Sequence, residues 1–182
     1  MFSNNVWKSY AAHEISHSMA HYLTTLYNLR RQRGYARVSD IAEELDVKKG
    51  SVSVQIKHLK EKGFVVEDEK RHLQLTERGE SVAQDVLKNR RVFIAFLMEV
   101  LGLPGDVAET DACKIEHLLS HETTDHLITL LQLLHSDEPE AKDLRKRLKG
   151  FEIECPTLEH CGICEDECLV EVEPHLRDPS AQ

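Results

Sequence analysis

Apolar and polar positions follow one another along most of this chain with the spacing of helices. Over residues 11–33 the apolar positions form one stripe, which predicts an amphipathic helix that ends before Gly34: Ile15, Met19, Leu23 and Leu26. A second, short helix is expected to begin at Ser39 as its N-cap. Asp40 would then lie in the first turn, where the helix dipole favours a carboxylate.

A third helix and a hairpin are predicted next. After a break at residues 46–50, apolar residues recur at helical spacing and are expected to face inward: Val52, Ile56 and Leu59. Two apolar runs at residues 64–66 and 73–75 flank a charged turn at residues 68–71, which predicts a hairpin. This order of elements over residues 35–76 is typical of a winged helix-turn-helix that binds double-stranded DNA.

The outward face of the third helix has the chemistry of a DNA-contacting surface. Its hydroxyl and amide groups suit base edges, and its lysines suit phosphates. The candidate DNA-binding residues are Lys48, Lys49, Ser51, Ser53, Gln55 and Lys57, with Lys70 and Arg71 at the tip of the wing. The alternative interpretation is a small helical domain with solvated charges.

The second half of the chain is predicted to be helical. A long helix from Thr76 to about Leu101 has more apolar residues than a winged helix can bury: Val86, Val92, Phe93, Phe96, Leu97, Val100 and Leu101. Contact with a partner subunit is the simplest way to bury these apolar side chains, which predicts a homodimer. Further helices are expected at residues 106–120, 123–135 and 137–150. The fold class is therefore mainly α, with a winged helix-turn-helix domain at 1–84, a helical dimerisation domain at 85–148 and a short Cys-rich tail at 149–182.

The net charge of -9 is divided unevenly along the chain. Residues 1–90 contain 15 Lys and Arg against 12 Asp and Glu, a balance of +3, whereas residues 91–182 have a balance of -12. This division agrees with a first half that faces DNA. No apolar run is long enough to span a membrane and no signal peptide is recognised, so we expect a cytoplasmic protein. Cysteines in that compartment are more often metal ligands than disulfides.

His13, His17 and His21 form a histidine stripe on the first predicted helix. The segment from His13 to His17 also matches H-E-x-x-H, the zinc-peptidase motif. We do not expect a peptidase, because the motif is short and the chain is too small and too helical to offer an obvious substrate cleft. No enzyme is expected. His13 and His17 either lie on a solvated face or, with His121, form a second metal site.

Three metal-ligand types lie close together on the predicted helix at residues 106–120. Cys113, Glu116 and His117 are at i, i+3 and i+4, so a thiolate, a carboxylate and an imidazole project from one helix face. The alternative is an ordinary helix with polar surface residues and a half-buried cysteine.

From about Ser16 to His126 the chain resembles the iron- and manganese-dependent repressors of the diphtheria-toxin-repressor (DtxR/MntR) family. The order and spacing of the third predicted helix, which is the recognition helix, and of four further segments carry the resemblance: HYLTTLY at 21–27, RVSDIAE at 37–43, LTERG at 75–79 and DACKIEHLLS at 111–120. The resemblance implies a homodimer that binds a two-fold operator when a divalent metal is bound. It also implies that the metal ties the first helix to the dimerisation helices.

The resemblance implies four metal ligands by position: His21, Cys113, Glu116 and His117. The family usually has Met or Asp in place of His21, so this set is softer than an oxygen-rich one. The softer set favours Fe(II), Zn(II) or Co(II) over Mn(II), and Fe(II) is the metal expected first. Where many relatives have a His in the long helix as a ligand of a second metal, this chain has Arg90, which argues against that second site.

The tail contains four cysteines with the spacing C-x5-C-x2-C-x3-C: Cys155, Cys161, Cys164 and Cys168. Four thiolates suit an iron–sulfur cluster, a structural zinc ion or, as a third interpretation, no ligand at all. The main hypothesis is a metal-activated transcriptional regulator, with repression the expected mode. The alternative is a winged-helix regulator that senses redox or iron status mainly through a cluster in the tail.

Overall fold

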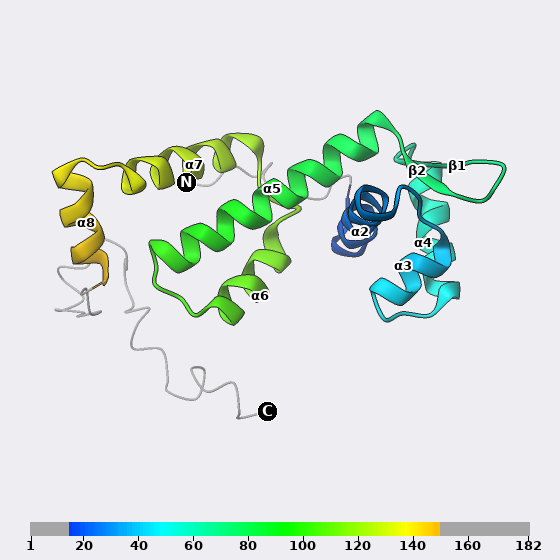
Figure 1. Cartoon of the computed structure of the whole chain (residues 1–182), viewed down its shortest axis with the longest axis horizontal. Coiled ribbons are helices and arrows are strands. Elements are labelled where there is room, and N and C mark those ends of the chain that lie inside the picture. The colour runs from blue at the N-terminus through cyan, green and yellow to red at the C-terminus, as the bar shows by residue number, and fades with distance from the viewer. Residues whose placement is uncertain (1–14, 150–182) are drawn as a thin grey trace, which may run out of the picture. The chain divides into compact units, whose positions relative to one another are not determined.

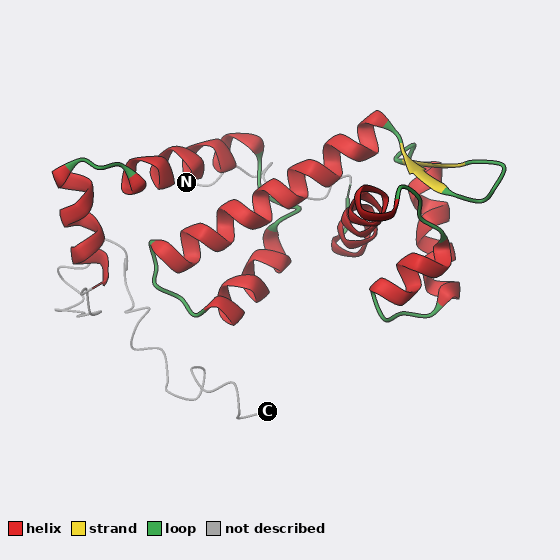
Figure 2. Ribbon diagram, in the orientation of Figure 1, coloured by secondary structure: helices red, strands yellow, loops and turns green. Residues whose placement is uncertain are grey.

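The structure is a computed structural model that describes residues 15–149. Figures 1 and 2 show helices throughout this part of the chain, with one two-stranded hairpin between α4 and α5. Within these residues, none of the helices combines the length and hydropathy needed to cross a membrane. The predicted fold class, a winged helix-turn-helix followed by a helical domain, is confirmed.

Helix α2 spans His17–Arg33 and starts later than predicted. Ser16 is its N-cap, and the Ser16 hydroxyl accepts a hydrogen bond from the backbone N–H of Met19. Gly34 ends the helix with φ of 79°, a left-handed conformation that glycine adopts without strain. The expected helical start at residue 11 is therefore wrong, because the cap places Ile15 and Ser16 outside the helix.

Helices α3 (Val38–Glu44) and α4 (Lys49–Glu61) form the helix-turn-helix. Helix α3 begins before Ser39, so Ser39 is not its N-cap as predicted. Instead the Asp40 carboxylate accepts a 2.8 Å hydrogen bond from the Arg37 backbone N–H, which satisfies a donor at the helix start. The inward face of α4 was predicted correctly, since its three apolar residues are buried: Val52, Ile56 and Leu59.

The wing consists of β1 (Val65–Glu67) and β2 (Leu73–Leu75), paired antiparallel with Val65 opposite Leu75. Its turn is held by Asp68, whose carboxylate accepts hydrogen bonds from the backbone N–H groups of Lys70 and His72. One core joins the wing to helices α2, α3, α4 and α5, with Leu23, Leu26 and Phe64 among its fully buried side chains. Because α2 shares this core, any group attached to α2 is coupled mechanically to the recognition helix.

Helix α5 (Glu77–Glu99) leads from the wing into the second half of the chain. Its N-cap is Thr76, whose hydroxyl accepts a hydrogen bond from the backbone N–H of Gly79. A Cβ at Gly79 would lie 2.0 Å from the carbonyl oxygen of Phe64, so this close approach of the helix to the wing requires glycine. Helix α5 packs against α2, α6 and α7 and so connects all three.

Helices α6 (Gly105–Ile115), α7 (His121–His135) and α8 (Pro139–Lys149) complete the described chain. Helix α6 ends about one turn earlier than predicted, and α7 begins earlier, with Ser120 as its N-cap. A turn at residues 116–119 therefore separates the two helices. Glu116 and His117 lie in this turn and not on the face of a continuous helix.

Candidate metal centre and DNA-binding surface

The side chains of His17, His21 and Cys113 converge between α2 and α6. The Nε2 atom of His21 lies 3.2 Å from the Sγ atom of Cys113 and 3.2 Å from the Nε2 atom of His17. The third side of this triangle, from Cys113 Sγ to His17 Nε2, is 3.9 Å. Two imidazoles and one thiol thus present their ligand atoms to the same point, which is an arrangement that a transition-metal ion could occupy.

Glu116 and His117 reach the same region from the turn after α6. The imidazole ring of His117 lies 5.3 Å from that of His17, measured between ring centroids. Glu116 is 1% exposed, and its Oε2 atom lies 3.6 Å from Nη1 of Arg90 on α5. Within residues 15–149 this oxygen has no hydrogen-bond partner, so a cation beside it would compensate a buried charge.

Burial shifts the proton affinities of these groups away from their ordinary values. Burial lowers the pKa of His21, and the neighbouring His17 and Arg90 lower it further. Burial and the Glu116 carboxylate raise the pKa of the Cys113 thiol, while Arg90 opposes that rise. Burial also raises the pKa of Glu116, again against the effect of Arg90. A bound dication would favour the thiolate and the carboxylate, so the donor set fits a divalent transition metal.

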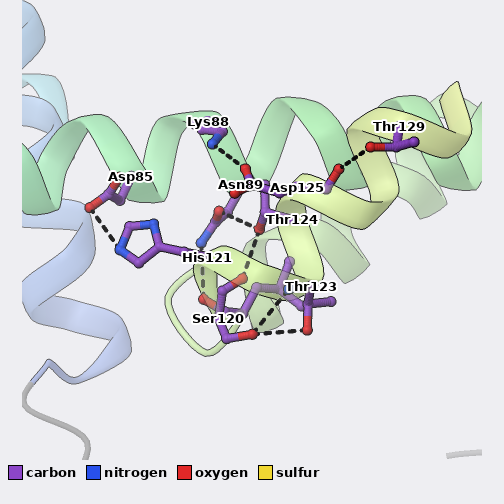
Figure 3. Close-up of polar contacts among 10 residues, drawn as sticks. Asp85, Lys88, Asn89, Ser120, His121, Thr123, Thr124, Asp125 and Thr129 are labelled. Carbon is purple, nitrogen blue, oxygen red and sulfur yellow. Dashed lines mark hydrogen bonds and ion pairs between the residues drawn. The ribbon is translucent and has the colours of Figure 1, made fainter. Parts of the chain in front are cut away.

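Asn89 fixes the turn that carries Glu116, and Figure 3 shows its side chain beside Thr124. Its side-chain N–H group donates to the carbonyl oxygens of Glu116, at 2.9 Å, and Leu119, at 3.3 Å. Its side-chain oxygen accepts a 2.7 Å hydrogen bond from the hydroxyl of Thr124 on α7. Asn89 was not predicted from the sequence, because an amide among the charged residues of a helix gives no signal until its partners are known.

The structure separates the histidines that were considered for a second metal site. His17 joins His21 and Cys113, whereas the His121 Nε2 atom lies 3.6 Å from Oδ2 of Asp85 on α5 (Figure 3). Among the described residues, His121 is not part of the metal-ligand group. His13 lies outside the described residues, as do the four tail cysteines, Cys155, Cys161, Cys164 and Cys168.

The predicted DNA-binding residues lie along α4 and the wing, at the surface. Gln55 is half-buried and the others are exposed: Lys48, Lys49, Ser51, Ser53, Lys57, Lys70 and Arg71. A groove between α4 and the wing is lined by Ser53, Lys57 and Arg71, together with Arg37 and Lys60. Glu67 also lines this groove and forms an ion pair with Lys60, and the other three cations suit contact with the sugar-phosphate backbone.

Two family models match this chain. The iron dependent repressor N-terminal DNA binding domain matches residues 14–73, and the iron dependent repressor metal binding and dimerisation domain matches residues 76–144. The HTH-type transcriptional regulator MntR of Oceanobacillus iheyensis is 33% identical over 132 residues, which are 72% of this chain and 89% of that protein. This chain belongs to the DtxR/MntR family.

Other DtxR/MntR relatives agree in sequence and fold. MntR of Bacillus subtilis is 32% identical over 135 residues, which are 74% of this chain and 94% of that protein. The chain in the crystal structure of T. acidophilum IdeR is 28% identical to this one in sequence. The two match with a TM-score of 0.53 over 62% of this chain and 53% of the IdeR chain. The manganese regulator SloR is 26% identical, with a TM-score of 0.57 over 63% of this chain and 53% of that one. This chain thus spans about half the length of these two solved chains.

Membership in the DtxR/MntR family confirms several predictions. The chain is a metal-dependent transcriptional regulator of a family that binds DNA operators and dimerises. Its relatives are transcriptional regulators and not enzymes, which confirms the expectation that this chain is no enzyme. Neither family model extends into the tail, so the cluster or zinc site predicted there stays a prediction.

Proposed function

We propose that this chain binds a two-fold operator as a homodimer and represses transcription when Fe(II) is bound between α2 and α6. The observation that supports this most directly is the 3.2 Å approach of His21 on α2 to Cys113 on α6. Residues 92 positions apart in the sequence present a nitrogen and a sulfur atom to one another at the junction of the two halves.

A metal at this junction has a mechanical consequence for DNA binding. Helix α2 contributes Leu23 and Leu26 to the winged-helix core, while α6 packs against α5. Ligands from α2 and α6 on one ion therefore fix the winged helix relative to the helical part of the same chain. In a homodimer this also fixes the distance between the two recognition helices, on which binding to both half-sites depends.

The four proposed ligands are His21, Cys113, Glu116 and His117, and they differ in how close they lie to one another. His21 and Cys113 are already within contact distance, and His117 lies beside His17. Glu116 is buried and is held by Arg90, so it can approach the ion only at the expense of that ion pair. Bound metal would supply a positive charge that competes with protons for these ligands, so affinity should fall as pH drops.

Fe(II) is preferred over Mn(II) on the chemistry of the donors. Thiolate and imidazole ligands bind the later first-row metals more strongly, whereas Mn(II) suits oxygen-rich sites. The relatives support Mn(II) as the alternative metal, because SloR is described as a manganese regulator and the relatives that are similar in sequence include MntR proteins. The alternative with a sensing iron–sulfur cluster has no support from the matched family models, and we do not include it in the proposal.

The test is metal-dependent DNA binding by the purified dimer without oxygen. Genomic fragments selected by the metal-loaded protein serve as the probe, and Fe(II), Mn(II), Zn(II) and Co(II) are compared. Glu116→Ala and His117→Ala should each remove metal-dependent binding and leave a folded dimer, whereas the exposed His126→Ala is the matched control. A full metal response in both site variants would contradict the proposal, as would stronger activation by Mn(II) than by Fe(II) at equal free concentration.

A further inference from the structure

His17 is placed like a metal ligand, although neither the position-by-position resemblance nor the predicted ligand set includes it. We propose that His17 binds the same ion as His21 and Cys113, and that this second imidazole selects against Mn(II). The proposal rests on the proposed function, since it concerns the ligands and selectivity of that same site.

The distances between the three ligand atoms fit a tetrahedral ion. Metal–nitrogen bonds of about 2.05 Å and a metal–sulfur bond of about 2.3 Å give tetrahedral edges of about 3.3 Å between two nitrogens and about 3.6 Å from nitrogen to sulfur. The observed edges are 3.2 Å between the two Nε2 atoms, and 3.2 Å and 3.9 Å from these atoms to Cys113 Sγ. Each observed edge therefore lies within about 0.4 Å of the corresponding edge of one tetrahedral face.

Local structure explains why His17 can take this position. Ser16 caps α2, so His17 is its first helical residue and lies one turn from His21. Residues at i and i+4 project from the same side of a helix, which brings two imidazoles next to each other without any loop. Helix α6 then provides Cys113 from the opposite side.

A simple hydrogen bond between the two histidines does not account for the whole arrangement. Their rings meet edge to face, with an interplanar angle of 79°, so stacking does not hold them together. One Nε2–H could donate to the other Nε2, but both Nε2 atoms also lie within 4 Å of the same sulfur. His17 is exposed, so water can satisfy its imidazole and burial does not require a hydrogen bond to His21.

A second imidazole changes what the site binds. With His17 included, His17, His21 and Cys113 supply two nitrogens and one sulfur, and a four-coordinate ion then has room for only one of the two proposed ligands from the turn, Glu116 or His117. Zn(II), Co(II) and Fe(II) accept such a set, while Mn(II) prefers more oxygen ligands. His17 is then the residue that shifts preference toward the softer metals.

The test uses Co(II) as a spectroscopic probe in the full chain. The four tail cysteines are first replaced by serine in a common background, so that Cys113 is the remaining thiol. In this background Co(II) should give a thiolate charge-transfer band and the intense visible bands of a four-coordinate ion. His17→Gln should keep the charge-transfer band, lose most of the visible intensity and bind Zn(II) about tenfold or more weakly. Mn(II) affinity should change by less than about threefold, because Mn(II) gains little from the lost imidazole.

Two control variants separate the possible failures. His121→Gln removes an exposed histidine from the first position of α7 and should behave like the background. His21→Gln should lose Co(II) binding under the proposed function itself. If His17→Gln matches the background in spectrum and in Zn(II) affinity, the role of His17 is wrong and the proposed function stands. If the background itself shows no thiolate band, both proposals fall.

Discussion

The hydroxyl of Thr124 donates a 2.7 Å hydrogen bond to the side-chain oxygen of Asn89, and both residues are buried. This bond orients the amide so that its N–H group holds the carbonyl oxygens of Glu116 and Leu119. The turn between α6 and α7 is thus fastened to α5 from inside the protein (Figure 3). Because Glu116 and His117 belong to this turn, the network positions two of the proposed metal ligands.

Thr124→Val should destabilise the metal-free protein and weaken metal binding. The substitution keeps the shape of the side chain and leaves the Asn89 oxygen without its donor, which costs about 1–3 kcal/mol for a buried polar atom. Urea denaturation of the metal-free protein measures the first effect, and a Co(II) titration measures the second. Thr129→Val is the control, since the hydroxyl of Thr129 is exposed and donates to the carbonyl of Asp125 on its own helix. Equal stability of the two variants would contradict the role of the network.

Arg90→Gln should lower the stability of the metal-free protein and increase the stabilisation that metal provides. Arg90 lies 3.6 Å from the buried Glu116 carboxylate, and its loss leaves that charge uncompensated, at a cost of about 1–3 kcal/mol because the arginine is partly exposed. A dication could then replace the missing charge. Thermal unfolding with and without Zn(II), in the background without tail cysteines, measures both quantities.

The neighbouring Arg91→Gln is the control for that experiment. Arg91 is exposed, and its Nε–H group donates to the carbonyl oxygen of Leu87 on the same helix. It should leave the melting temperature and its increase with Zn(II) near those of the parent protein. An increase with Zn(II) for Arg90→Gln that is no larger than that of Arg91→Gln would refute the prediction.

Gln55→Ala and Lys57→Ala should affect DNA binding in different ways. Gln55 is expected to contact a base edge, so its loss should reduce discrimination between operator and altered operator by about 1–3 kcal/mol. Lys57 is exposed and is expected to contact a phosphate, so its loss should weaken binding to all sequences and reduce the salt slope by about 0.9. Fluorescence anisotropy at several salt concentrations separates the two effects. The exposed Lys142→Ala on α8 should change neither quantity.

The wing turn should lose its order only at acid pH. Backbone N–H donation from His72 to the Asp68 carboxylate lowers the pKa of Asp68 below its ordinary value, and donation from Lys70 adds to this. A carboxyl group with a lowered pKa in the folded state stabilises that state above the unfolded-state pKa, and the contribution is lost as pH falls through the folded-state pKa. The amide resonances of Lys70 and His72 should therefore titrate with a midpoint below the ordinary pKa of an aspartate side chain. A midpoint above that value would show that these hydrogen bonds do not favour the ionised form.

Met98→Asp combined with Leu101→Asp should dissociate the dimer. These side chains near the end of α5 are 45% and 54% exposed in the single chain, and the stacked rings of Phe93 and Phe96 belong to the same helix. Carboxylates on a surface that a partner covers should raise the dissociation constant by about 100-fold or more. Sedimentation velocity measures the change. Val54→Asp, on the exposed face of α4, should leave the dimer intact and weaken DNA binding, and dissociation by Val54→Asp would assign the interface to the wrong surface.

The sequence by itself determined the elements and most of their faces. The helical stripe of Met19, Leu23 and Leu26, the inward face of α4 and the hairpin around residues 68–71 all follow from local periodicity and turn residues, which act within a few positions of the chain. The family and its regulatory function could also be inferred from the spacing of a few segments. The helix boundaries were less accurate, because caps such as Ser16 compete with neighbouring polar residues of similar propensity.

The resemblance already placed His21 and Cys113 at one site, but only the tertiary structure decided which other side chains meet them. His17 and His21 looked like one face of an isolated helix until the packing of α6 brought Cys113 within 4 Å of both. Asn89 acquired a role only when α7 placed Thr124 beside it. Contacts between residues far apart in the sequence depend on how helices pack around a shared core, and no local pattern records that geometry.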